Sequence, residues 1–245
     1  MKKIVLAVAG CFLLSYAFSQ DVPGNTVSSP KNLKLPNRAA DHFMLQLSSD
    51  HWSGTPDSIS SHQNGFSRGF NAYLMFDKPF KTAPKLSLGI GLGISTSNIF
   101  FKRMDVNLKA GGTVLPFTAV DSTFHFKKYK MATGFLEVPL EFRYMAKPLT
   151  PNKSFKAAVG LKFGTMVNAH TKGKTLQDKN NNTANNYALK EIDRRLLNST
   201  RFMGTARFGY GIFSFFGSYQ LNKLLKDGAG ADMHLYQVGL TLSGL

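Results

Sequence analysis

The sequence predicts an all-β protein: a single antiparallel transmembrane β-barrel of about eight strands, with short periplasmic turns and long extracellular loops. Three observations lead to this prediction. The chain begins with the pattern of an export signal, it then alternates apolar and polar residues in segment after segment, and the connections between these segments are alternately short and long. Alternation with a period of two indicates strands with two different faces, and connections of unequal length at the two ends are typical of bacterial outer-membrane barrels.

The first segment predicts export from the cytoplasm. Lys2 and Lys3 precede an apolar run over 4–14, and small residues stand three and one positions before a cleavage point after Ser19. This arrangement is that of a secretory signal peptide, and the apolar run is shorter than the roughly 20 residues that a membrane-spanning helix needs. We therefore predict a signal peptide over 1–19 and a location in the bacterial outer membrane after its cleavage.

The single cysteine of the chain excludes a framework of internal disulfides. Cys11 lies inside the predicted signal peptide. The preceding Val8-Ala9-Gly10 also fits a lipoprotein box. Lipidation of Cys11 instead of its removal therefore stays open.

The charge of the chain is strongly positive. Lys and Arg number 30 and Asp and Glu number 14, so the net charge is +16, or +14 (16 − 2) without Lys2 and Lys3. Such a charge is typical of nucleic-acid-binding proteins, but export separates the chain from cytoplasmic nucleic acid, so we predict no nucleic-acid partner. The mean hydropathy of −0.14 excludes a bundle of transmembrane helices and suits a barrel, because half of each barrel strand faces a polar interior.

Eight segments have the alternation of strands. Residues 20–38 are rich in Ser, Pro and Asn without an apolar period, so we predict a periplasmic linker there and the barrel over 39–245. The clearest strand is 85–97, where Leu and Ile alternate with Gly and Ser. In order, the predicted strands are 43–48, 70–77, 85–97, 135–144, 155–164, 202–210, 213–221 and 236–243.

The connections differ in length. Short, turn-like connections join strands near 78–84, 145–154 and 210–211, and two of them contain proline. The remaining connections are longer: 49–65, 98–128, 168–199 and 222–234. Within the third of these, Leu189, Ile192, Leu196 and Leu197 have helical spacing, so we expect a helix within 188–198.

Alternation alone does not decide which face meets lipid, because a soluble lipocalin-type barrel alternates with its apolar face inward. Three observations favour the membrane. The polar face of 85–97 is made only of Gly and Ser, which suits a crowded interior, and charges keep mostly to one face, with Arg68 excepted near a loop. The third is that aromatic residues gather at strand ends, as in interfacial girdles: Phe76, Tyr144, Phe155, Tyr210 and Phe213 toward the turns, and Phe100, Phe101, Phe202 and Tyr219 toward the loops.

Three segments carry a resemblance to a known family: 135–144 (FLEVPLEFRY), 209–221, and the closing 238–242 (VGLTL). On these the chain resembles the outer membrane β-barrel domain family, often described as porin-family or PorT-type barrels of Gram-negative bacteria. The resemblance covers 39–245. It implies the barrel fold, an outer-membrane location and insertion by the barrel assembly machinery. The family also includes a component of a protein-secretion and gliding apparatus.

Charged residues on the inward face of the predicted strands form one candidate site. An eight-stranded barrel is narrow enough for side chains to fill it, and buried charges have to be paired. Counted from the turn side, Glu137 lies at the height of Lys162, and Glu141 at the height of Arg207. The sequence therefore predicts a network, structural or gating a narrow pore, of Glu137, Glu141, Arg143, Lys162 and Arg207.

Basic residues of the long loops form a second candidate site. Lipopolysaccharide carries phosphates and acidic sugars, which Lys and Arg just beyond an apolar belt would neutralise. The sequence therefore predicts that outer-membrane lipid and lipopolysaccharide are partners, alongside envelope proteins. The predicted contacts are Lys172, Lys174, Lys179, Lys190, Arg194 and Arg195.

The sequence contains no signature of catalysis, and we predict no enzymatic activity, metal or cofactor. The loop histidines lack the spacing of a metal motif, and 178–182 resembles the start of a calcium loop but lacks its later Gly and Glu. We expect a barrel with a structural or surface-interaction role, and the sequence leaves open whether it also forms a narrow pore. The alternatives are a membrane component of a secretion or gliding apparatus, and a lipid-modifying barrel enzyme. The loop histidines are His51, His62, His125, His170 and His234.

Overall fold

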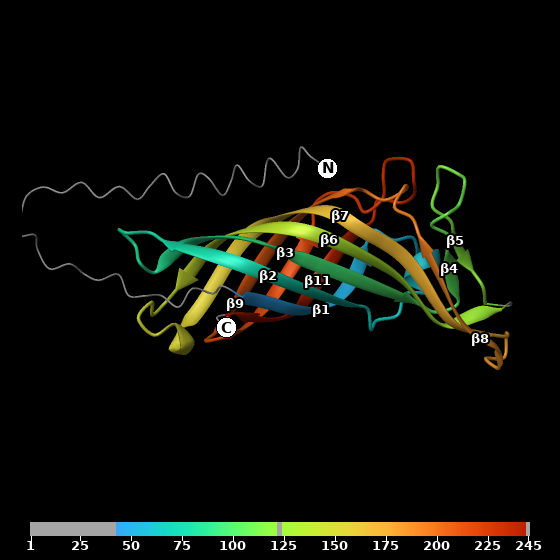
Figure 1. Cartoon of the computed structure of the whole chain (residues 1–245), viewed down its shortest axis with the longest axis horizontal. Helices are drawn as coiled ribbons and strands as arrows, with labels where there is room; N and C mark the ends of the chain where they lie inside the picture. The colour runs from blue at the N-terminus through green and yellow to red at the C-terminus, as the bar shows by residue number, and fades with distance from the viewer. Residues whose placement is uncertain (1–42, 122–123, 244–245) are drawn as a thin grey trace, which may run out of the picture. The chain divides into compact units, whose positions relative to one another are not determined.

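The computed structural model describes residues 43–121 and 124–243, and within them the protein is an antiparallel β-barrel (Figure 1). Each barrel strand pairs with its neighbours, and the pairing of β11 with β1 and of β6 with β7 closes the ring. The predicted fold class is therefore confirmed. The eight barrel strands are β1 (Phe43–Ser53), β2 (Arg68–Pro79), β3 (Leu86–Phe101), β6 (His125–Met145), β7 (Phe155–Gln177), β9 (Thr200–Tyr210), β10 (Phe213–Gln220) and β11 (His234–Ser243).

Short connections gather at one end of the barrel, which we call the turn end, and long connections gather at the other, which we call the loop end. The β6–β7 turn contains the 3-10 helix η1 (Pro151–Lys153). The β9–β10 hairpin has two loop residues, since Tyr210 pairs with Phe213, and Gly211 takes a φ of +62° that favours glycine. The predicted asymmetry of the connections is thus present.

The small residues of β3 are explained by crowding inside the barrel. A Cβ atom added to Gly89 would lie 2.6 Å from Nε of Arg143, and one added to Gly93 would lie 2.1 Å from the carbonyl oxygen of Ala72. Only glycine fits at such distances. The Gly and Ser face of this strand therefore points inward, and its Leu and Ile face points outward.

Two strands extend well beyond their predicted ends. β6 begins at His125 and β7 ends at Gln177, and they pair with each other over this whole length. Residues 125–128 of the predicted second loop and 168–177 of the predicted third loop therefore belong to a hairpin that rises beyond the barrel. The register shifts between Gly134 and Phe135.

The helix expected within 188–198 is wrong. The strand β8 (Thr183–Ile192) includes the first five residues of this segment and pairs with the extension of β7 (Figure 1), and the described residues that follow it are not helical. The extension leaves backbone donors and acceptors along its edge, and a strand satisfies them whereas a helix does not. Leu196 and Leu197 follow β8 and are buried beneath the loops.

The other loops contain short elements. The helix α2 (Asp57–Ser60) lies between β1 and β2, and β4 (Met104–Val106) pairs with β5 (Phe117–Ala119) between β3 and β6. Among residues 43–121 and 124–243, no helix has the length and apolar composition needed to cross a membrane.

Several predicted segments lie outside the described residues. These are the signal peptide 1–19 with Cys11, the linker 20–38, and the first residues of the predicted barrel segment, 39–42. The boundaries of these predicted domains stay predictions.

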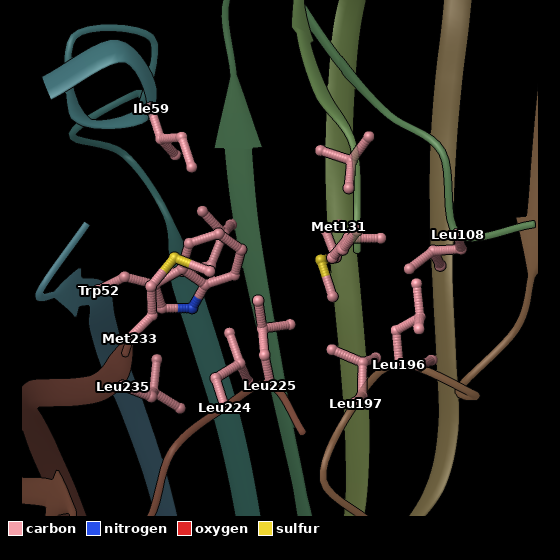
Figure 2. Close-up of a cluster of buried hydrophobic side chains, with 14 of the residues drawn as sticks. Trp52, Ile59, Leu108, Met131, Leu196, Leu197, Leu224, Leu225, Met233 and Leu235 are labelled. Carbon is pink, nitrogen blue, oxygen red and sulfur yellow. The ribbon is translucent and has the colours of Figure 1, made fainter. Parts of the chain in front are cut away.

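Apolar side chains from all the long connections meet in one cluster at the loop end, which we call the loop core (Figure 2). Trp52 packs against Phe101 with ring centroids 5.6 Å apart. Phe101, predicted to lie in an interfacial girdle, is instead 3% exposed in this cluster, because alternation along β3 turns it inward and turns Phe100 outward. The loop core includes Trp52, Ile59, Phe101, Leu108, Met131, Leu196, Leu197, Leu224, Leu225, Met233 and Leu235.

Candidate functional site

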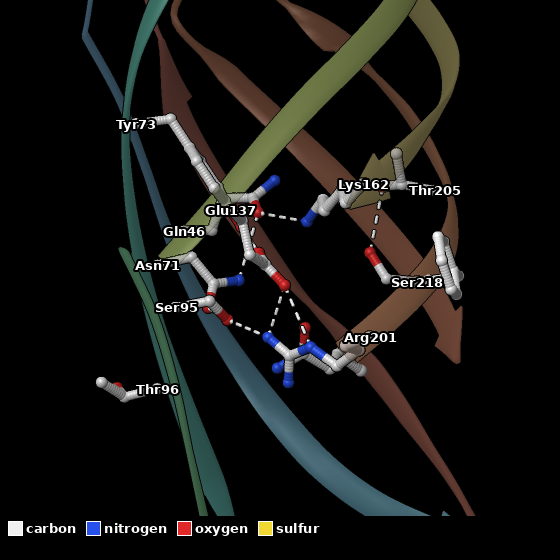
Figure 3. A network of polar contacts seen from close by, with 12 residues as sticks. Gln46, Asn71, Tyr73, Ser95, Thr96, Glu137, Lys162, Arg201, Thr205 and Ser218 are labelled. Carbon is white, nitrogen blue, oxygen red and sulfur yellow. Dashed lines mark hydrogen bonds and ion pairs between the residues drawn. The ribbon is translucent and has the colours of Figure 1, made fainter. Parts of the chain in front are cut away.

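A buried ion pair lies inside the barrel. Nε of Arg201 on β9 donates to Oε1 of Glu137 on β6 at 3.0 Å, and the Tyr73 hydroxyl donates to Oε2 at 2.6 Å (Figure 3). Both members of the pair are 1% exposed. The guanidinium of Arg201 also lies 3.8 Å from the ring centroid of Phe135. A charge buried this deeply requires such partners, because the desolvation of an unpaired charge destabilises the fold by roughly several kcal/mol.

The absence of a side chain at Gly164 allows Arg201 to reach Glu137. Glu137 pairs with Gly164 across β6 and β7, and Gly164 pairs with Arg201 across β7 and β9, so the three lie in one cross-strand row. A Cβ atom on Gly164 would lie 2.9 Å from Cγ of Glu137. Glycine at the centre of the row therefore leaves the space in which the two charges meet.

A second ionic cluster lies nearer the turn end. Nη2 of Arg207 contacts Oε2 of Glu141 at 3.1 Å, and Nε of Arg143 contacts the same oxygen at 2.8 Å. Nη1 of Arg143 lies 3.5 Å from Oδ1 of Asp77, which accepts a hydrogen bond from Ser87 at 2.6 Å. Two guanidinium groups are thus compensated by two carboxylates.

Neutral polar side chains connect the rest of the interior. Nζ of Lys162 donates to Oε1 of Gln46 at 3.0 Å, and Nδ2 of Asn71 donates to the same oxygen at 3.2 Å (Figure 3). Ser95 links Asn71 to Arg201, with contacts of 2.7 Å on each side. The Glu137–Arg201 pair and Lys162 therefore belong to one hydrogen-bonded network that crosses the barrel.

All five predicted interior residues are buried in the barrel: Glu137, Glu141, Arg143, Lys162 and Arg207. The structure brings Glu141 and Arg207 into direct contact. It does not do so for Glu137 and Lys162, because Lys162 stands opposite Pro139 and contacts Gln46. The partner of Glu137 is Arg201, which sequence reasoning missed although alternation from Phe202 would have placed it inward.

The outer face of the barrel has the opposite character. Large apolar side chains stand exposed on every barrel strand, and the aromatics predicted at the turn end, Phe76 and Phe213 among them, are exposed there. A contiguous apolar surface of this extent is not tolerated in water and marks contact with lipid. On β3 and β6 this apolar band comprises Leu88, Ile90, Leu92, Ile94, Leu136, Val138, Leu140 and Phe142.

A family model described as outer membrane protein beta-barrel domain matches residues 27–226. The chain belongs to the outer membrane protein β-barrel domain family. No curated protein matches the sequence. The family agrees with the polar interior and the apolar exterior, and identifies this molecule as a membrane barrel.

The predicted basic loop residues of this outer-membrane barrel separate into two groups. Lys172 and Lys174 on β7 and Lys190 on β8 belong to the paired hairpin extension. Lys179 lies exposed at the β7–β8 turn, where the backbone N–H of Asn182, above all, lowers the pKa of the neighbouring Asp178. Arg194 and Arg195 are exposed, yet their guanidinium groups donate to backbone carbonyls, of Met166 at 2.9 Å and of Gly112 at 2.9 Å.

Cross-strand register aligns the first group with a residue outside the predicted set. Lys130 on β6 pairs with Lys172 on β7, which pairs with Lys190 on β8. Lys128 likewise pairs with Lys174. The alignment depends on the extension of β6 beyond its predicted start, and the sequence alone therefore gave no signal for it.

Two loops bring a serine, a histidine and an aspartate into contact. Nε2 of His62 lies 3.2 Å from Oδ2 of Asp121, and the Ser61 hydroxyl lies 3.1 Å from Nδ1 of His62. However, Nδ1 also lies 2.9 Å from the carbonyl oxygen of Ser58, which can only accept, so Nδ1 carries a proton. Since the Ser61 hydroxyl also lies 2.8 Å from the Asp57 carbonyl, His62 is not placed to remove its proton.

Metal binding has no support from the described part of the chain. No group of three or more His, Cys, Asp or Glu side chains that could hold a metal ion occurs within residues 43–121 and 124–243. His51 contacts Ser49 at 2.9 Å and stacks on Tyr236, and His234 stacks on Tyr219. These histidines are therefore held by strand neighbours.

Proposed function

We propose that this protein is a non-enzymatic outer-membrane barrel with a structural or surface-interaction role, and that it is closed to ions rather than a narrow pore. One observation carries the proposal: paired charges fill the interior, centred on Glu137 with Arg201 and on Glu141 with Arg207. The loop core lies beyond this network at the loop end. An ion entering the barrel would meet both.

The physical argument against conduction is energetic. A permeating ion would have to displace Arg201 or Glu137 from a partner at hydrogen-bond distance, and each group left alone in the interior would lose its compensation. It would then have to cross the apolar loop core, where no polar partner replaces its hydration shell. A structural role for the interior network requires neither step.

The proposed cellular setting follows from the family and the sequence. We propose cleavage of the signal peptide, insertion by the barrel assembly machinery, and a mature protein whose long loops face outward. Its proposed partners are outer-membrane lipid, lipopolysaccharide and envelope proteins, with no nucleic acid. The basic extension of β6, β7 and β8 supports this orientation, because phosphates and acidic sugars lie at the outer surface.

A second candidate function is a membrane component of a protein-secretion or gliding apparatus, such as the PorT-type members of the family. The edge of β8 favours it. Among the described strands β8 pairs with β7 alone, and nine of its ten residues are exposed. A free strand edge can pair with an extended segment of another protein. Capture of specific envelope partners that is lost on placing proline in β8 would support this candidate.

Conductance in planar lipid bilayers tests the leading proposal. The mature protein, refolded and shown to change electrophoretic mobility on boiling, is expected to give no channel steps under conditions in which an open porin does. Reproducible steps from the wild-type protein that change in size in Glu137→Gln would contradict the closed barrel and restore the pore.

The absence of enzymatic activity has its own test. We expect no fatty-acid release from labelled envelope lipids, and no difference between the wild type and His62→Ala. Release that is abolished by the substitution would favour the lipid-modifying alternative.

A further inference from the structure

Positive charges form a row around the barrel, immediately beyond the apolar band at the loop end. Phe100 on β3 pairs with Lys130, Lys130 pairs with Lys172, and Lys172 pairs with Lys190. Arg68 on β2 completes it, with its guanidinium carbon 5.7 Å from the ring centroid of Phe100. We call Arg68, Lys130, Lys172 and Lys190 the basic row.

The row points away from the interior. Ile99 and Phe101 are buried on either side of Phe100, and Tyr129 and Met131 are buried on either side of Lys130. Alternation along a strand then places Phe100 and Lys130 on the outer face. Nζ of Lys130 lies 5.8 Å from the Phe100 centroid, so this ring stands between two cations.

The charges of the row are uncompensated within the described residues. Arg68, Lys130, Lys172 and Lys190 form no salt bridge with a described residue. Burial lowers the pKa of Lys130, which lies beyond the apolar band, and the neighbouring charges of Lys172 and Arg68 lower it further. Like charges directly opposite each other on paired strands are destabilising. An anionic ligand on the row would relieve this repulsion.

An apolar groove adjoins the row at Arg68. Its volume is about 500 Å³, and its lining includes Leu47, Phe66 and Phe70 besides Arg68. The guanidinium carbon of Arg68 lies 5.0 Å from the ring centroid of Phe66, so the charge lies against an aromatic ring that also lines the groove. A free phosphate would use the charges but not the groove, whereas an acylated phosphate would use both.

We propose that the basic row and its groove bind a phosphorylated glycolipid of the outer leaflet. The phosphates lie on the row, where Lys and Arg form charge-assisted hydrogen bonds with them. The acyl chains follow the groove onto the apolar band. The assignment rests on the proposed orientation, in which the loop end faces outward.

Native mass spectrometry of the full mature protein tests this site with three probes. These are a bis-phosphorylated acylated glucosamine disaccharide (lipid A), the same lipid without phosphates, and inorganic phosphate. We expect the wild type to retain the phosphorylated lipid and to bind the dephosphorylated lipid at least about tenfold more weakly. The reason is that each cation near an anionic headgroup contributes measurably to the binding free energy. Inorganic phosphate should compete poorly.

Three variants locate the binding. K130Q/K172Q/K190Q should weaken lipid A binding by about tenfold or more, whereas K130R/K172R/K190R should preserve it. The matched control K81Q/K85Q/K147Q removes three charges at the turn end and should bind as the wild type does. Heat-modifiable electrophoresis must show every variant folded.

Each other outcome overturns the site. Equal binding by the wild type and the glutamine variant would place the lipid elsewhere. Equal binding of both lipids would exclude phosphate recognition, and full competition by inorganic phosphate would indicate an adventitious anion site. These results leave the closed barrel intact, since conductance tests that separately.

Discussion

The two halves of β6 belong to one strand, yet one half buries charged side chains and the other buries apolar ones. Below the register shift, Glu137 and Glu141 are buried and Leu140 is exposed. Above it, Tyr129 and Met131 are buried in the loop core, and Lys130 faces outward. β7 shows the same reversal, with Lys162 inside the barrel and Lys172 outside the extension.

The same face of β6 is buried in both halves, so the reversal shows that the surroundings decide whether that face carries charged or apolar side chains. Around the barrel the outer phase is hydrocarbon, so apolar side chains face out and the interior accepts charges that pair with each other. Around the extension the outer phase is water and headgroups, so the usual arrangement of a soluble protein returns. The register shift at Gly134 and Phe135 lies where one regime gives way to the other.

The free energy of unfolding should be more sensitive to a single substitution in the interior network than to one in the loop core. Arg201→Met leaves Glu137 buried without its cation, and removing one partner of a buried ion pair costs about 3–5 kcal/mol. We expect this loss in the free energy of unfolding, measured by urea denaturation of the barrel in lipid vesicles. Mobility on unboiled gels should show a partly unfolded population.

The double variant E137Q/R201M separates a charge effect from a packing effect. It removes both charges, so its loss should be smaller than that of R201M alone. A double variant as unstable as the single one would show that Arg201 acts mainly through packing on Phe135, 3.8 Å away.

A substitution in the loop core should leave a cavity, whereas one in the interior network leaves a buried, unpaired charge. Leu197 is 0% exposed and forms an isolated bridge with Leu225. Leu197→Ala should cost about 2–5 kcal/mol, the usual range for a buried leucine. The loss should be local: proteolysis and hydrogen exchange of 220–233 should accelerate, while the heat-modifiable mobility of the barrel stays unchanged.

Leu189→Ala provides a control for this prediction. Leu189 is 45% exposed on β8 and lies outside the loop core, so its truncation should have little effect on the same segment. If Leu197→Ala unfolded the barrel together with the loops, the two regions would form one cooperative unit and the distinction drawn from β6 would fail.

The sequence revealed the membrane part of the molecule better than the part outside it. Period-two alternation is a local property, and it identified eight strands and the inward face of Glu137, Glu141 and Lys162 correctly. The segment 125–134 lacks this alternation, because the register shift and the change of surroundings interrupt it. The extension of β6 and β7 could therefore not be predicted from the sequence.

The errors that remain concern contacts between distant segments. β8 is a strand because the edge of β7 is available, and residues 188–198 viewed alone have helical spacing. Glu137 meets Arg201 because Gly164 stands between them in the cross-strand row. Heights counted along the chain suggested Lys162 instead, because the tilt and stagger of strands are set only when a barrel closes.

The smallest predicted effect concerns a carboxylate at the edge of the loop core. Burial raises the pKa of Asp105, and the nearby Glu191 raises it further, while its Oδ1 is buried without a hydrogen-bond partner in the described residues. A raised pKa means that the folded state holds the proton more tightly than the unfolded state. The stability of this loop should therefore fall as pH rises from the ordinary carboxyl range, near about pH 4, through the raised value.

Asp105→Asn removes this loss, so hydrogen exchange of 104–119 should be slower than in the wild type at about pH 7 and equal to it at about pH 3. Asp178→Asn is the control with the opposite sign. The pKa of Asp178 is lowered by the backbone N–H of Asn182, so the wild-type β7–β8 turn gains protection as pH rises, and the variant should lose it only at neutral pH. If both variants changed exchange in the same direction, the net charge of the loops would explain the result, and not the burial of Asp105 and the hydrogen bonding of Asp178.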